Sequence, residues 1–159
     1  MTRWHKAGMM IGVLLCYSLV WAEQQLGIGD QAPAVAGEDQ HGEKFAMNSS
    51  VRVLLLSFDM ASGKQANRYL AEQGADYLDR HRAVYVANIY GMPAIGKFFA
   101  LRKMRSYPHR IVLSEQEHAL DALPRESGAV TVVRINDARR VTSLDFWRPG
   151  EQPLQQFLE

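Results

Sequence analysis

The tripeptide Ser62–Lys64 combines residue types that could bind phosphate, because it follows an apolar segment and opens a predicted helix. A phosphate-binding loop also needs a glycine five residues before its second glycine and a serine or threonine after the lysine. The chain has Phe58 and Gln65 at those two places, which argues against nucleotide hydrolysis. Two uses remain open. Asp59 or Ser62 caps the helix, or the free N–H groups of its first turn belong to a recognition surface.

Cysteine chemistry depends on a single residue, Cys16, which lies in an N-terminal apolar segment. If that segment is removed, the remaining chain has no thiolate nucleophile, no disulfide and no cysteine-ligated metal. Thiol–disulfide exchange requires a thiolate that attacks sulfur. We therefore expect neither disulfide exchange nor cysteine-based peroxide reduction from the processed chain.

Metal and hydrolase motifs are missing from the sequence. The G-x-S-x-G pattern of serine hydrolases is absent, and no H-x-x-x-H spacing brings two histidines onto one helix face. The histidines of the processed chain are far apart in sequence: His41, His81, His109 and His118. We therefore predict no metal site, no catalytic residue and no cofactor.

A basic run lies in the second half of the chain and comprises Arg102, Lys103, Arg105, His109 and Arg110. Two interpretations stay open: a solvated surface with cations at a helix C-terminus, or a patch for an anionic ligand or acidic partner. The whole chain has 18 basic and 17 acidic residues, a net charge of +1. This balance does not favour nucleic-acid binding.

Residues 1–22 match a secretory signal peptide. Arg3 and Lys6 precede the 15-residue apolar run Ala7–Trp21, and Val20–Ala22 fits a cleavage site. As a helix this run would span about 22 Å, less than the roughly 30 Å hydrocarbon core of a membrane, although a retained anchor is the alternative. Cleavage would leave one domain, residues 23–159, with 16 basic and 17 acidic residues and a net charge of −1. We expect this domain in the periplasm, without stable membrane insertion.

Predicted strands alternate with predicted helices after residue 50. Continuous apolar runs predict buried strands over Val51–Phe58 and Ala83–Ile89, and a further strand is expected over His109–Leu113. A helix is expected over Lys64–His81, with Gly74 as its weak point. Pro93 opens another helix, whose apolar residues Ile95, Phe98 and Phe99 fall on one face.

Hairpins are expected on both sides of this alternating region. The first lies within Ala32–Met47, with Gly42 in its turn, and the second joins Ala129–Ile135 to Val141–Trp147. Either Trp147 or its neighbour Phe146 should pack in the core, and a short helix over Glu151–Glu159 closes the chain. The order predicts one α/β domain with a central mixed sheet flanked by helices and an N-terminal β-hairpin extension.

Three stretches resemble a thioredoxin fold with an N-terminal extension of the peroxiredoxin type: Gly29–Pro33 followed by Asp39–Gly42, Val51–Lys64, and Tyr107–Leu113. The resemblance covers nearly all of residues 27–159. It implies that Val51–Lys64 contains the strand and loop that normally carry Cys-x-x-Cys-Lys, and that Tyr107–Pro108 is a cis-proline loop beside it. Met60, Ala61, Ser62 and Gly63 stand where Cys-x-x-Cys would be, so both catalytic cysteines are missing.

A closer resemblance is to the small exported proteins of the YtfJ type, through Val51–Leu54, Tyr107–Pro108 and Glu126–Val133. Some relatives of this general type carry a flavin-dehydrogenase label. No residue of this chain supports that activity, since G-x-G-x-x-G is absent and the domain leaves little room for a dinucleotide.

We therefore expect a redox-inactive periplasmic binding or adaptor protein, with an envelope protein or peptide as its partner. The proline turn would leave strand-edge groups free to pair with an extended peptide. The expected contact residues are Asp59, Met60, Ser62, Lys64, Arg105, Tyr107, Pro108 and His109. Two alternatives remain: a non-cysteine oxidoreductase or electron-transfer accessory, associated with flavin, and a purely structural envelope component.

Overall fold

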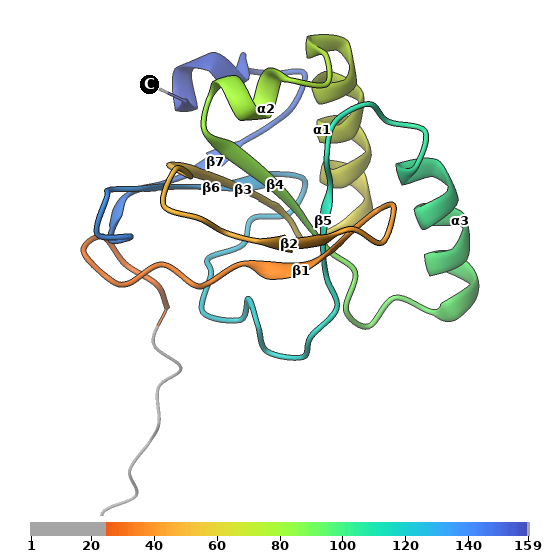
Figure 1. Cartoon of the computed structure of the whole chain (residues 1–159), viewed down its shortest axis with the longest axis horizontal. Coiled ribbons are helices and arrows are strands. Elements are labelled where there is room, and N and C mark those ends of the chain that lie inside the picture. Colours follow the sequence, from red (N-terminus) through yellow and green to blue (C-terminus); the bar gives the residue numbers. More distant parts are fainter. Residues whose placement is uncertain (1–24, 159) are drawn as a thin grey trace, which may run out of the picture.

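A seven-stranded mixed sheet forms the centre of the molecule, with its strands in the order β2-β1-β5-β4-β3-β6-β7 (Figure 1). The computed structural model describes residues 25–158, so the predicted signal peptide lies outside the described residues. The strands are β1 (Ala36–Asp39), β2 (Lys44–Ala46), β3 (Val53–Ser57), β4 (Ala83–Asn88), β5 (Val112–Ser114), β6 (Val130–Ile135) and β7 (Val141–Trp147). The parallel strands β3, β4 and β5 are adjacent, and the two predicted hairpins, β1–β2 and β6–β7, are antiparallel.

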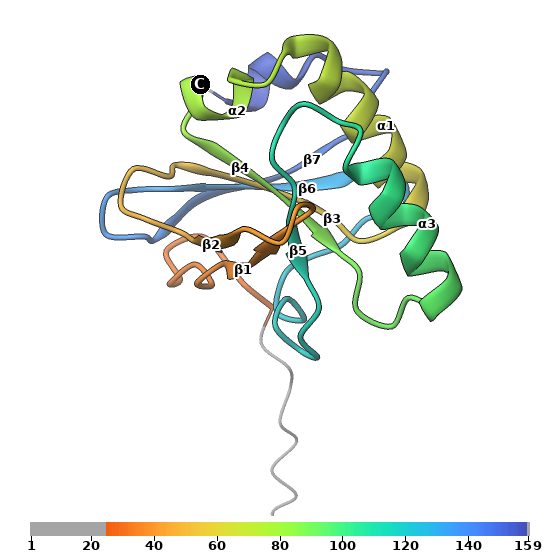
Figure 2. The ribbon, with the colours of Figure 1, turned by 45° about the vertical axis from the view of Figure 1, so that its right-hand side comes forward.

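Helices cover one face of this sheet (Figures 1 and 2). They are α1 (Met60–Gln73), α2 (Tyr77–Arg80), α3 (Ala94–Met104) and the 3₁₀ helix η1 (Leu154–Phe157). The crossovers β3–α1–β4 and β4–α3–β5 move in the same direction across the sheet, so right-handed connections place α1 and α3 on the same side. The opposite face packs against irregular segments that contribute Val35, Leu120 and Leu123. Both faces are covered, as predicted, but helices cover only one of them.

The predicted apolar segments form buried strands of the sheet. Every residue of β3 is buried, and Leu54, Leu55 and Leu56 have no exposed surface. Trp147 is also fully buried while Phe146 is half-buried, which confirms that one member of this pair packs in the core.

Three elements differ clearly from the prediction. The strand expected over His109–Leu113 is the shorter β5, Val112–Ser114. The expected helix over Lys64–His81 is divided at Gly74, whose φ of +97° favours glycine and ends α1. The expected closing helix is only the 3₁₀ turn η1. Among the described residues, no helix is long and apolar enough to cross a membrane.

Candidate functional site

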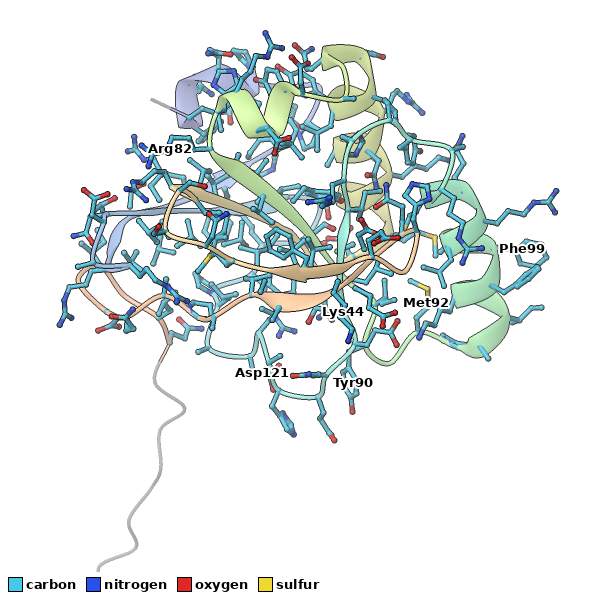
Figure 3. All side chains as sticks on the ribbon, in the orientation of Figure 1. Lys44, Arg82, Tyr90, Met92, Phe99 and Asp121 are labelled. Atoms are coloured by element: carbon cyan, nitrogen blue, oxygen red, sulfur yellow. The ribbon has the colours of Figure 1, made fainter. Side chains whose placement is uncertain are left out.

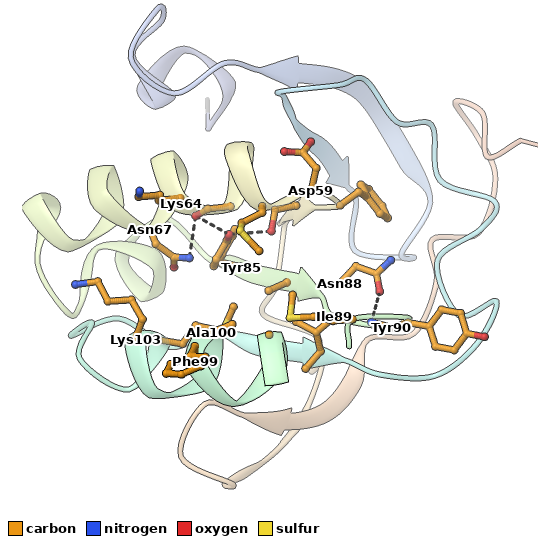
Figure 4. A pocket seen from close by; sticks show the side chains of 18 of the residues that line it. Asp59, Lys64, Asn67, Tyr85, Asn88, Ile89, Tyr90, Phe99, Ala100 and Lys103 are labelled. Carbon is orange, nitrogen blue, oxygen red and sulfur yellow. Dashed lines mark hydrogen bonds between the residues drawn. The ribbon is translucent and has the colours of Figure 1, made fainter. Parts of the chain in front are cut away.

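A pocket of about 560 Å³ opens between the N-terminal half of α1 and α3, at the carboxyl ends of β3 and β4 (Figure 4). Ser57 and Asn88, the last residues of these two strands, line it. Lys64 and Asn67 of α1 face Phe99 and Lys103 of α3 across the opening. Ligands of open α/β sheets commonly bind outside the carboxyl ends of parallel strands, so the position is typical of a binding site.

Large apolar side chains in and near this pocket remain in contact with solvent. No residue of α3 is buried: Ile95 is 69% exposed, and Phe98 and Phe99 are each 60% exposed. Met60 and Tyr90 are also exposed, and both line the pocket. Figure 3 shows Tyr90 and Phe99 at the surface of the molecule. The apolar face predicted for this helix therefore exists, but it points away from the core.

The polar groups on the pocket floor bond to one another. Tyr85 Oη lies 2.9 Å from Ser57 Oγ, and Asn67 Nδ2 donates to Gly63 O at 2.8 Å. Burial raises the pKa of Tyr85 above its usual range, so its phenol is neutral at physiological pH. These contacts form a satisfied polar floor, and none of them pairs a nucleophile with a general base.

His109 lies behind Asn67 and is only 1% exposed. Its Nε2 is 2.9 Å from Asn67 Oδ1, and because the amide nitrogen of Asn67 already donates to Gly63, the histidine must donate here. Nδ1 of His109 therefore carries no proton, and it has no hydrogen-bond partner within residues 25–158. Burial lowers the pKa of His109 to about 4, so the ring is neutral at pH 7. His109 therefore supports the pocket from the protein interior, through Asn67, and adds no charge to the basic run.

Asp59 joins the start of α1 to the segment before β6. Its Oδ1 accepts a hydrogen bond from Ser62 N at 2.8 Å, and its Oδ2 accepts one from Gly128 N at 3.1 Å. Burial opposes ionisation of this carboxyl, but these backbone donors outweigh it and hold its pKa below the usual value. Asp59 is thus the N-cap of α1, which was one of the two uses predicted for it.

Asp59→Ala is expected to lower the free energy of unfolding by about 1–2 kcal/mol, because the N-cap bond and the tie to Gly128 are both lost. Urea denaturation at pH 7 measures this effect. Glu72→Ala, which removes an exposed carboxylate from the same helix, is the matched control and should change stability by less than about 0.5 kcal/mol. Equal effects of the two substitutions would contradict the capping role.

The predicted cis bond between Tyr107 and Pro108 is wrong, because the described chain contains no cis peptide bond. The trans form is the lower in energy at X–Pro bonds, by about 0.5–1 kcal/mol. The segment hydrogen-bonded to Asp59 is the one at Gly128, which precedes β6. Tyr107 nevertheless lines the pocket, with its ring stacked on that of His109 at a centroid distance of 5.6 Å.

The strand-edge groups after the proline turn are not free for a peptide. Gln40 Nε2 donates to His109 O at 2.8 Å, and Gln40 Oε1 accepts from Ile111 N at 2.8 Å. The backbone of Gln40 also donates to Ile111 O at 3.1 Å. Gln40 therefore occupies the edge that we expected an extended peptide to use.

The structure separates the eight predicted contact residues into three groups. Asp59, Met60, Lys64 and Tyr107 line the pocket. Ser62 and His109 are buried beside it, while Arg105 and Pro108 are exposed outside its lining. Tyr90 and Phe99 also line the pocket, although neither was predicted as a contact residue. For Phe99 the signal in the sequence was the apolar stripe that it forms with Ile95 and Phe98.

Comparisons with known proteins identify the fold. No family model matches the sequence, and no curated protein matches it. Solved structures do match, among them a provisionally assigned thiol:disulfide interchange protein, DsbE, from Chlorobium tepidum, with a TM-score of 0.57 at 16% identity over 84% of this chain and 96% of the other. The chain has a thioredoxin-like fold.

Two further structures agree with this fold. A provisionally assigned protein disulfide isomerase from Bacteroides thetaiotaomicron has a TM-score of 0.55 at 16% identity, covering 84% of this chain and 86% of the other. A thio-disulfide isomerase from Thermus thermophilus has a TM-score of 0.51 at 17% identity, covering 82% and 94%. All three names refer to thiol–disulfide chemistry, whereas residues 25–158 of this thioredoxin-like chain contain no cysteine.

Proposed function

We propose that this chain is an exported, redox-inactive member of the thioredoxin-like fold that binds a partner protein in the periplasm. In this proposal residues 1–22 are removed on export, and the partner binds on the surface between α1 and α3. The proposal rests chiefly on exposed apolar side chains at this surface: Met60, Tyr90 and Phe99 line the pocket, and Ile95 and Phe98 are exposed beside Phe99 on α3.

An apolar cluster of this kind supports binding because contiguous exposed patches commonly mark interaction sites. None of these side chains is buried in the core, and α3 contributes no buried residue at all. The pocket adds a concave, mostly apolar feature to the patch, which is the shape that an inserted side chain of a partner requires.

The same surface offers little to support catalysis. The start of α1 has Met60 and Gly63 where thiols would be needed for disulfide exchange. The hydroxyls of Ser57 and Tyr85 bond to each other, and the buried His109 is held by Asn67. Over residues 25–158 no cluster of potential metal ligands is found. Binding is therefore the function that the geometry supports best.

Site-specific photocrosslinking in the periplasm tests this proposal. A photoreactive residue at Phe99 is expected to give one discrete crosslinked product, which mass spectrometry identifies. The same residue at Ala138, in the exposed turn between β6 and β7 at the far end of the sheet from α3, should give no such product (Figure 1). The absence of a product specific to Phe99 would refute the proposal, and a flavin spectrum of the purified protein would favour the oxidoreductase alternative.

A further inference from the structure

We propose that the partner segment is an amphipathic helix, with its apolar face in the pocket and acidic residues opposite Lys64 and Lys103. This inference rests on the proposed function, because it names the chemistry of the segment bound at the same site. It follows from three features of the surface between α1 and α3: its charge, its length and the absence of free main-chain partners.

The charge at one end of the pocket is positive. Lys64 and Lys103 line opposite walls there, and a second depression continues beyond them along α1. Arg68 and Glu72 line this continuation together with the two lysines, so three cations face one carboxylate. Among the described residues, Asp59 is the only acid that lines the main pocket, and it already accepts hydrogen bonds at both of its oxygens. Acidic side chains on the partner would complement this end of the site.

The length of the combined depression suits a short helix. Its lining runs along α1 from Met60 to Glu72, a distance of about 18 Å at the helical rise per residue. A partner helix of about twelve residues has the same length. Its residues at i, i+3, i+4 and i+7 would form the apolar stripe that the pocket accepts.

The partner must satisfy its own main chain, because no unpaired strand edge lines the described pocket. β3 is paired with β4 and β6, β4 is paired with β3 and β5, and Gln40 occupies the backbone groups of His109 and Ile111. An extended segment would bury N–H and C=O groups against apolar walls without partners, at a cost of about 1–3 kcal/mol each. A helix bonds these groups internally. This favours a helix over the extended peptide that the sequence suggested.

Selection from two peptide libraries tests the inference on the purified full-length protein. One library of roughly 14-residue peptides places apolar residues at i, i+3, i+4 and i+7, and the other has the same composition in the alternating pattern of a strand. We expect enrichment from the helical library alone, with Asp or Glu concentrated in one terminal turn of the selected peptides. Fluorescence anisotropy then gives the affinity of a selected, labelled peptide for each variant.

Charge reversal separates the electrostatic contribution to peptide affinity from the contribution of apolar packing. Lys64→Glu and Lys103→Glu together should weaken the selected acidic peptide about tenfold, and a peptide with lysines in place of its acids should regain affinity. Phe99→Ala should weaken both peptides. Lys44→Glu, an exposed charge reversal on β2 that does not line the pocket, is the control and should leave the affinity unchanged. Unchanged affinity in the double reversal would refute the acidic part of the inference.

Each of the remaining outcomes would overturn the inference, but they differ in whether the proposed function would still hold. Enrichment from the strand-patterned library alone would refute the helix but leave partner binding in place. A concentration-dependent dimer that Phe99→Asp dissociates, measured by analytical ultracentrifugation, would assign the surface to a second copy of the chain. Enrichment from neither library would refute the helical partner, and the Phe99 crosslink would then decide whether a partner binds at all.

Discussion

Trp147→Ala is expected to lower the free energy of unfolding by about 3–5 kcal/mol. Trp147 is fully buried at the end of β7, and Tyr69 of α1 meets its ring edge-on with 5.1 Å between centroids. Its Nε1 donates to Gln152 O at 3.0 Å. Alanine would leave a cavity in the core cluster beneath α1 and would remove the donor to Gln152.

Guanidinium denaturation followed by far-ultraviolet circular dichroism measures this loss. Tryptophan fluorescence is unsuitable, because Trp147 is the sole tryptophan of residues 25–158. Phe146→Ala is the matched control: Phe146 is the half-buried neighbour on the same strand, and its loss should cost less. If the two substitutions destabilised the protein equally, Trp147 would not be the anchor between α1 and β7.

Most of the sheet could be predicted from local sequence because its central strands are uninterrupted apolar runs. A continuous apolar run such as Val53–Leu56 can be buried on both faces only inside a covered sheet. The structure places it there. Gly42, with a φ of +87°, marks the first hairpin turn in the same way. These signals lie within a few neighbouring residues, so the sequence pattern alone is sufficient to read them.

The orientation of α3 could not be predicted, because an apolar stripe looks the same whether it faces a core or a partner. Ile95, Phe98 and Phe99 have the spacing of a core-facing helix, yet all three are exposed. The packing of the sheet face is completed by α1, α2 and partly buried residues such as Leu101 and Met104. Only the three-dimensional arrangement shows that Ile95, Phe98 and Phe99 remain largely exposed in the described chain.

Contacts between distant residues account for the errors at the site. The proline turn at Pro108 was assigned from its position before a strand, but Gln40, about 70 residues away, determines the hydrogen bonding there. His109 was placed with the basic residues around it, yet Asn67, 42 residues earlier, holds it in the interior. Met60, Lys64 and Tyr107 line the same pocket, because the fold brings the strand end and the later loop together, and their role as contact residues stays a prediction.

Acidification from pH 6.5 to 5 is expected to reduce the free energy of unfolding by roughly 2 kcal/mol, because His109 is buried as a neutral ring. Its pKa is about 4 in the folded protein, whereas an unfolded histidine has the ordinary value of 6.5. In this pH window the unfolded state therefore binds a proton that the folded state does not. The contribution of neutral His109 to the free energy of unfolding is fully present above pH 6.5. It is lost progressively as the pH falls towards 4.

Urea denaturation at several pH values, compared between the wild type and His109→Gln, isolates this effect. The glutamine side chain does not titrate, so the slope of stability against pH between 6.5 and 5 should become shallower even if the variant is less stable at pH 7. His41→Gln, which removes an exposed histidine, should keep the wild-type slope. Asp59 contributes little in this window, because its pKa lies below the ordinary value and its stabilising effect is lost mainly at lower pH. If His109→Gln left the slope of stability against pH unchanged, the ring would take up its proton without unfolding of the protein. The polar floor behind Asn67 would then be open to water.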